Sequence, residues 1–443
     1  MKKLKQFISW LIIGFIFLLP LQTRLIYKQG ILNAGVWEYG TFSLYATELL
    51  FFVILALTII YCVKLITTNN ALNKNHWRRL LPLVAVALIM AVNIYLSQNQ
   101  SLAFYKLGQL IEATALFFII LIIKPEFQRI SWSIVLSGLV QSVSAIEQFI
   151  DQKVIANKWL GMASQSPEIL GTPIVQLDGV RWLRTFGTFS HPNMLAGFLV
   201  VGLILIIGLY ASANKEKIKK YLSLIFVINS VALFTTLSRA ALIAMFFSII
   251  LFAFLSRKDQ LLNKTVTKFA LIFIFIAIVF SATYPELIFS RTFSGNRVEN
   301  ISNTTRIEQY KEYWPIIKNN WLTGVGLGNY TVELFADDST KEAWQYQPLH
   351  NTYLLIFTEL GIFGFILILS LIFYVFNLAR GTLTCHATPD HSPGDATSTP
   401  RLTCFTCLAS LAVLALFDHY LWSFYSGIIL ISIILAIQKQ KTI

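Results

Sequence analysis

The feature that most restricts the fold of this chain is a series of long, nearly uncharged apolar runs. A helix needs ~20 apolar residues to cross a bilayer whose hydrocarbon core is ~30 Å thick. These runs are too long for ordinary strands, and they lack the alternating pattern of a half-buried sheet. We expect about twelve spans, near residues 7–23, 44–66, 80–97, 102–123, 130–150, 188–210, 221–237, 239–256, 268–284, 349–378, 404–418 and 420–437.

Composition supports the same class of protein. Of 443 residues, 56% are hydrophobic and only 13% are charged, and the mean hydropathy is +0.65. A soluble domain of this length with so few charged residues would not have enough polar surface to face water. The sequence therefore predicts an all-α polytopic membrane bundle of about twelve transmembrane helices, with residues 1–443 as a single integral membrane domain.

The net charge of +13 could indicate a nucleic-acid partner, but the basic residues lie in short clusters between apolar runs. Such clusters mark the cytoplasmic ends of spans. With twelve spans they all fall on one side, so we expect cytoplasmic termini, a lipid bilayer as partner and no nucleic acid. We interpret the N-terminal "MKKLK" and the following apolar run as a retained first span. The clusters are Lys2/Lys3/Lys5, Lys74/Arg78/Arg79, Lys124/Arg129, "NKEKIKK", "SRKDQLLNKTVTK" and Lys439/Lys441.

Three connections are too long to be simple turns. Residues 151–187 and 285–348 are expected on the outer side, and the larger one is expected to contain short helices. Residues 381–403 are rich in Thr, Pro, Ser, Asp and His, which predicts a flexible cytoplasmic loop.

Helical spacing within the larger outer loop predicts a helix lying at the membrane surface, with Pro315 awkward for its continuity. Apolar residues on one side of this helix would be Ile307, Tyr310, Trp314 and Ile317, and the aromatic residues near lipid headgroups would be Tyr310, Tyr313, Trp314 and Trp321.

Arginines beside the outer ends of spans need a reason, because basic residues are disfavoured there. Arg184 and Arg239 occupy such positions, and Arg306 lies in the larger outer loop. The planar guanidinium binds phosphate oxygens through paired hydrogen bonds, so these residues are candidates for binding a lipid pyrophosphate. Contacts with lipid headgroups or nearby acidic residues better explain the positions of three further arginines: Arg181, Arg291 and Arg297.

His350 lies where the larger loop re-enters the membrane. A neutral imidazole there could take a proton from a hydroxyl, although a lone histidine at a helix start is more often structural. Asn351 is a natural helix cap. Glu359 lies ~13 Å deeper along the helix axis at ~1.5 Å per residue, where it would join helices or pair with an arginine.

Other motifs have simpler explanations. "GVGLGN" lacks the strand of a nucleotide fingerprint and predicts a tight turn with exposed amides. His191 in "SHPN" is expected to cap a helix. Cysteines and histidines around residues 385–407 could be drawn as a zinc site, but free thiols are favoured, so we predict no metal and no cofactor.

Four pieces in this order resemble the O-antigen ligase/polymerase superfamily of membrane glycosyltransferases: "RTFGTFSHPNMLAGF", "TTLSRAALIA", "TRIEQYKEYWPIIKNNWLTGVGLGNY" and "HNTYLLIFTELGIFG". The resemblance covers roughly residues 180–365. It implies a bacterial inner-membrane enzyme with a twelve-helix fold.

The reaction that the resemblance implies transfers a glycan from an undecaprenyl-pyrophosphate carrier to an acceptor hydroxyl, without metal or nucleotide sugar. His350 would be the general base, Arg184 and Arg306 would hold the pyrophosphate with Arg239 as a weaker candidate, and Asn351 and Glu359 would support the site.

The sequence leaves alternatives open. The acceptor could be a lipid-linked sugar, another glycan or a protein hydroxyl, so ligase, polymerase and protein oligosaccharyltransferase are not separated. A transporter of a small solute such as bicarbonate is the competing class. It is less favoured because the notable charges gather at the outer face rather than at the membrane midplane.

Overall fold

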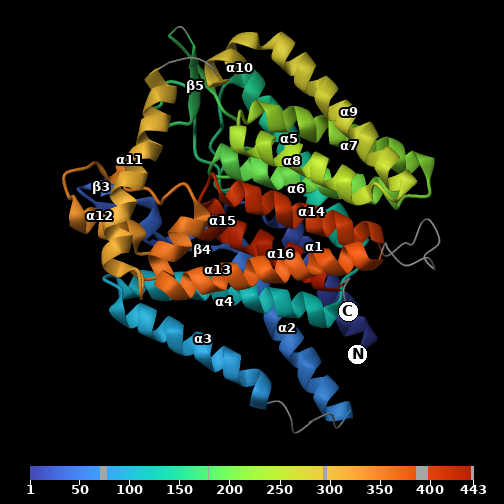
Figure 1. Cartoon of the computed structure of the whole chain (residues 1–443), viewed down its shortest axis with the longest axis horizontal. Helices are drawn as coiled ribbons and strands as arrows, with labels where there is room; N and C mark the ends of the chain where they lie inside the picture. Colours follow the sequence, from blue (N-terminus) through green and yellow to red (C-terminus); the bar gives the residue numbers. More distant parts are fainter. Residues whose placement is uncertain (70–76, 178, 293–296, 386–397, 441–443) are drawn as a thin grey trace.

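The computed structural model describes residues 1–69, 77–177, 179–292, 297–385 and 398–440 (Figure 1). Twelve helices run lengthwise through the molecule and correspond in order to the twelve predicted spans. They are α1 (Lys2–Leu18), α2 (Ala46–Asn69), α3 (Trp77–Leu96), α4 (Gln100–Ile123), α5 (Phe127–Asp151), α6 (Pro192–Ala211), α7 (Glu216–Thr235), α8 (Arg239–Ser256), α9 (Gln260–Thr283), α13 (Thr352–Cys385), α14 (Ser398–Ala415) and α16 (Tyr425–Gln440).

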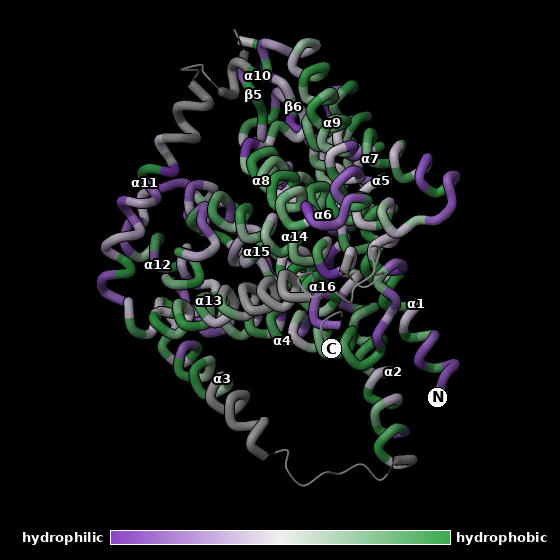
Figure 2. The backbone as a smooth tube through the Cα atoms, turned by 45° about the vertical axis from the view of Figure 1, so that its right-hand side comes forward, coloured by the Kyte–Doolittle hydropathy of each residue, from purple (hydrophilic) through white to green (hydrophobic). Residues whose placement is uncertain are grey.

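Length and composition support a multi-pass membrane protein. Among the described residues, seven helices are long and apolar enough to cross a bilayer: α2, α4, α5, α6, α7, α8 and α9. Four shorter apolar segments accompany them, at Ala87–Leu96, Thr352–Leu367, Thr399–Ala415 and Tyr425–Gln440. Figure 2 shows hydrophobic residues along the long helices and polar residues around α11 and α12 and near the N-terminus. The prediction of an all-α polytopic fold is confirmed.

Helix α6 lies at the centre of the bundle, packed against α5, α7, α8 and α14. It is apolar on all sides, and nearly all of its residues are buried, as expected for a helix without a polar face. At Gly197, a Cβ atom would meet the Tyr420 hydroxyl at 1.8 Å. The missing side chain therefore allows the chain around residue 420 to pack directly against α6.

The remaining elements lie mainly in the connections at the end of the bundle opposite the two termini (Figure 1). Three two-stranded antiparallel sheets pair β1 with β4, β2 with β3, and β5 with β6. The bounds are β1 (Arg24–Lys28), β2 (Ile31–Leu32), β3 (Gly35–Val36), β4 (Phe42–Tyr45), β5 (Ile174–Leu177), β6 (Val180–Leu183), α10 (Pro285–Thr292), α11 (Arg297–Asn320), α12 (Tyr330–Asp337), α15 (Tyr420–Ser423) and the 3₁₀ helices η1 (Glu38–Gly40) and η2 (Ala343–Gln345).

Helix α11 runs crosswise to the long helices in Figure 1 and continues through Pro315. Tyr310, Trp314 and Trp321 are exposed, in agreement with a helix at a membrane surface. Tyr313 does not fit this expectation, because it is only 6% exposed and packs with Ile316 and Ile317 in a small core. The predicted apolar face was therefore wrong at Ile317, which lies on the buried side.

The ends of the last two spans differ from the prediction in a way that matters for the site. Helix α14 ends at Ala415, and α16 begins at Tyr425. The residues between them form a turn and the short helix α15 instead of continuing the spans. Asp418 causes this local structure, because its carboxylate accepts hydrogen bonds from the first amides of the turn, as shown below.

The predicted flexible segment 381–403 lies partly outside the described residues. Helix α13 reaches Cys385, and α14 starts at Ser398. Residues 386–397 between them are not described.

Candidate functional site

His350 lies directly before α13, at the end of the bundle that carries α11 and α12. Asn351 accepts a hydrogen bond from the Leu354 amide through Oδ1, at 3.1 Å, and so caps α13. The next residue, Thr352, donates its hydroxyl to the Asp418 carbonyl at 2.7 Å. These bonds hold the start of α13 against the turn between α14 and α15.

The His350 ring is oriented by Gln309 of α11. Nδ1 lies 2.9 Å from Gln309 Oε1, and the His350 backbone amide lies 3.4 Å from the same oxygen. A backbone N–H can only donate, so this oxygen is the acceptor for both groups. Nδ1 therefore carries the proton, and Nε2 has the free lone pair that a general base requires.

Gln309 was not predicted from the sequence, although a signal for it exists. The buried side of α11 carries Arg306, Gln309, Tyr313 and Ile316, at spacings of three and four residues. The sequence predicted an apolar side of this helix around Tyr310 and Trp314. The adjacent side, which carries Arg306 and Gln309, acts on His350.

Asp418 is the second polar centre of the site and was also missed. It is 5% exposed. Oδ1 accepts the amides of His419 at 2.7 Å and Tyr420 at 3.2 Å, and Oδ2 accepts Nδ2 of Asn193 at 2.6 Å. A charged residue between two apolar runs was a signal that could have identified it.

The pKa of Asp418 follows from these contacts. Burial alone would raise the pKa, whereas positive charge on His419, His350 or His191 and the hydrogen bond from Asn193 lower it. Three N–H donors point at its two oxygens, an arrangement that suits the ionised carboxylate.

His350 and His419 pack edge to face, with ring centroids 5.2 Å apart. Burial lowers the pKa of His419 to about 3, against the opposing effect of Asp418. Burial also lowers the pKa of His350, with Asp418 raising it and Arg306 lowering it further. Both imidazoles are thus neutral at pH 7, a state in which a histidine can accept a proton.

Arg184 reaches the same centre through one intermediate residue. Its Nη2 donates to Asn193 Oδ1 at 2.6 Å, and its Nε donates to the Thr236 carbonyl at 2.9 Å. Since Asn193 in turn donates to Asp418, the chain of hydrogen bonds runs from Arg184 to the carboxylate beside His350.

Of the other predicted residues, Arg306 acts electrostatically on His350, as noted above. Arg239 is the first residue of α8 and is half-buried, three residues after the Thr236 that Arg184 contacts. The bonds linking Arg184 to Asp418 do not include it. His191 caps α6 as expected, its Nδ1 accepting the Asn193 amide at 3.2 Å.

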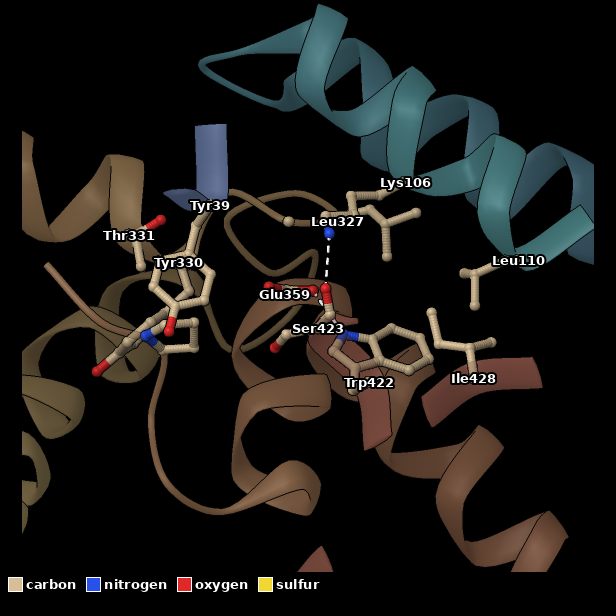
Figure 3. Close-up of a pocket in the computed structure, with 12 residues that line it drawn as sticks. Tyr39, Lys106, Leu110, Leu327, Tyr330, Thr331, Glu359, Trp422, Ser423 and Ile428 are labelled. Atoms are coloured by element: carbon tan, nitrogen blue, oxygen red, sulfur yellow. Dashed lines mark hydrogen bonds between the residues drawn. The ribbon is translucent and has the colours of Figure 1, made fainter. Parts of the chain in front are cut away.

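Glu359 joins α13 to α15 by accepting a hydrogen bond from Trp422 Nε1 at 2.7 Å. Lys106 of α4 donates to the Ser423 carbonyl at 2.8 Å. Figure 3 shows these side chains around a pocket that Tyr39 and Tyr330 also line. The partner of Glu359 is thus a tryptophan, with a lysine nearby, and no arginine was found to bond it in the described residues.

The "GVGLGN" segment forms the predicted tight turn, with positive φ at all three glycines. Its amides are not exposed. Val325 and Gly326 donate to the carbonyls of Thr358 and Glu359 at 2.9 and 3.0 Å. Helix α13 breaks there at Gly361, where a Cβ atom would lie 2.5 Å from the Leu322 carbonyl oxygen. The turn therefore docks onto the break in α13.

The part of the chain that the structure describes contains no group of three or more His, Cys, Asp or Glu side chains placed to hold a metal ion. Cys404 and Cys407 are buried free thiols in α14. The Cys385 side chain, His386 and His391 lie outside the described residues.

The fold and the site together define a multi-pass helical membrane protein with a buried polar centre at one end of its bundle. Residues 224–369, about a third of the chain, match the family model Wzy_C, described as O-antigen ligase. This match supports the resemblance to the O-antigen ligase/polymerase superfamily over these residues. It includes Arg239, Arg306 and His350, whereas Arg184 and Asp418 lie outside it. A comparison with curated proteins found no match.

Proposed function

We propose that this protein transfers a glycan from an undecaprenyl-pyrophosphate carrier to an acceptor hydroxyl. The family match supports a ligase-type reaction on a lipid-linked glycan. The observation that carries the proposal is the state of His350. It is a half-buried, neutral imidazole whose Nδ1–H is held by Gln309, so that Nε2 can act as a base.

The chemistry requires one proton transfer and one displacement. Nε2 of His350 takes the proton of the acceptor hydroxyl as the oxygen attacks the anomeric carbon. The bond from that carbon to the pyrophosphate oxygen breaks, and its electron pair stays on the phosphate. Attack opposite the leaving group inverts the anomeric carbon.

Arginines supply the compensating charge. Arg306 is the cation that acts on His350 from α11, and it would bind the developing pyrophosphate charge. Arg184, whose guanidinium is oriented by its bonds to Asn193 and Thr236, would contribute a second positive charge. Arg239 would contribute from the start of α8. We assign Asn351 and Glu359 supporting roles, as the cap and the anchor of α13.

The proposed setting is the bacterial inner membrane, with both termini cytoplasmic and the site on the outer side. Both termini lie at one end of the bundle, and the site lies at the other (Figure 1). Basic clusters between spans support assigning the end with the termini to the cytoplasm.

The test is a transfer assay with purified protein, a polyprenyl-pyrophosphate glycan and candidate acceptors: a lipid-linked core sugar, a second carrier-linked glycan and a protein. General-base catalysis contributes ~10²–10⁴-fold, so His350→Ala should lose at least a hundredfold in rate. His391→Ala, in the predicted cytoplasmic segment, is the matched histidine control. Wild-type rates in a folded His350→Ala protein would refute the base assignment. Bicarbonate uptake in vesicles without any transfer would favour the transporter.

A further inference from the structure

A second pocket lies between the N-terminal hairpin β1–β4, the segment before α6 and Phe424. Its cavity volume is about 140 Å³. Most ligand pockets are of ~300–1,000 Å³, so this one would hold one end of a larger molecule. Its polar lining comprises Gln22, Arg24, Glu38, Gln165 and Ser190, and its aromatic lining comprises Tyr45, Phe186, Phe189 and Phe424.

The only two charged side chains that line this pocket in the described residues neutralise each other. Arg24 Nη1 and Nη2 lie 2.6 and 3.0 Å from Glu38 Oε1 and Oε2. The guanidinium also lies 6.0 Å from the centre of the Tyr45 ring. A bidentate pair is geometrically well defined, so its remaining donors and acceptors are held in place.

The pocket is close to His350. Phe424 stacks on His419 with ring centroids 6.1 Å apart, and the His419 ring contacts His350 at 5.2 Å. Tyr39, the residue after Glu38, contacts the His419 ring at 5.6 Å and the Phe424 ring at 6.1 Å. Two rings, Phe424 in the pocket wall and His419 behind it, therefore lie between the pocket and the proposed base.

Charge distinguishes the possible ligands. A pyrophosphate would meet the Glu38 carboxylate and an arginine already engaged by it, whereas Arg306 offers a cation on the His350 side. Sugar hydroxyls both donate and accept, and they suit a neutral Arg–Glu pair flanked by amides and a serine. The apolar face of a sugar ring can pack on the aromatic side chains.

We propose that this pocket binds the acceptor as a neutral saccharide, and that Arg24 and Glu38 determine which saccharide is accepted. The assignment of the ligand as acceptor rests on the proposed function. Both residues precede the segment that matches the O-antigen ligase model.

Ligand-observed NMR on the detergent-purified protein tests binding directly. The probes are glucose, galactose and N-acetylglucosamine at millimolar concentration, with inorganic pyrophosphate as competitor. We expect at least one sugar to bind and pyrophosphate not to displace it. Arg24→Gln and Glu38→Gln should each weaken binding about tenfold, the effect of losing ~1.4 kcal/mol. Arg129→Gln, which breaks a pair with Glu126 at the other end of the bundle, should leave it unchanged.

Transfer kinetics provide the second measurement. Arg24→Gln should raise the acceptor KM about tenfold and leave the donor KM unchanged. If Arg24→Gln does not fold, Arg24→Lys is measured in its place. Sugar binding without any wild-type transfer would overturn the proposed function but keep the pocket as a saccharide site. Absence of sugar binding, displacement by pyrophosphate, unaltered binding in both variants or a raised donor KM would each overturn the pocket assignment.

Discussion

Substitutions at Gln309 test whether His350 acts through Nε2. The hydrogen bond from Nδ1 to Oε1 spans 2.9 Å and is part-buried, since Gln309 is 4% exposed and His350 is half-buried. In Gln309→Leu, either Nδ1–H stays without its acceptor, or the proton moves to Nε2 and removes the base. An unsatisfied buried donor costs ~1–3 kcal/mol, and each ~1.4 kcal/mol is tenfold in rate. We expect kcat to fall about tenfold to a hundredfold, with both KM values little changed.

The pH profile gives a sharper readout. A base works only when unprotonated, so the rate falls as pH drops through its pKa. Burial lowers the pKa of His350 from 6.5, so the midpoint of the wild-type acidic limb should lie below pH 6.5. Gln309→Glu places a carboxylate against Nδ1, which raises a histidine pKa by ~1–3 units. The acidic limb of kcat/KM should therefore move upward by at least one unit.

The assay measures transfer from a lipid-pyrophosphate glycan between pH 5 and 8 with wild type and both variants. Gln98→Leu is a control at the same end of the bundle, where Gln98 contacts Glu333. An unchanged kcat in Gln309→Leu, together with an unchanged profile in Gln309→Glu, would refute the role of Nε2.

Three further predictions follow from single contacts. Arg306→Lys should lower kcat/KM for the donor at least tenfold, because an ammonium cannot form the paired hydrogen bonds that a guanidinium makes to phosphate. Steady-state kinetics at varied donor concentration measure this. Equal kcat/KM values in the two proteins would argue against phosphate binding by Arg306. Gly326→Ala should lower the unfolding temperature in detergent more than Gly171→Ala does. Both positions have positive φ, but only at Gly326 would the Cβ atom meet a side chain, at 2.0 Å, so equal shifts would contradict the packing argument. Trp422→Phe should destabilise the protein by ~1–3 kcal/mol in denaturant unfolding, because it removes the donor to buried Glu359; an unchanged midpoint would mean that this bond is not needed.

Several features could be predicted from local sequence because their causes are local. Apolar runs of bilayer length become helices, since the backbone has no other partner for its hydrogen bonds in lipid. Asn351 and His191 cap helices because a cap needs only an acceptor side chain just before the first turn. The turn at "GVGLGN" follows from three glycines that tolerate positive φ.

The partners of His350 depend on folding across long stretches of chain. Gln309 is 41 residues away along the sequence, and its helical spacing with Arg306 and Tyr313 does not tell what that side of α11 contacts. Asn193 and Asp418 are 225 residues apart, yet they share one hydrogen bond. One apolar helix surface can pack against almost any other. The runs of hydrophobic residues therefore predict that α6, α13, α14 and α15 pack together, but they do not predict the register in which they pack. Packing sets that register, and with it which few polar groups meet away from water, where each one must find a partner.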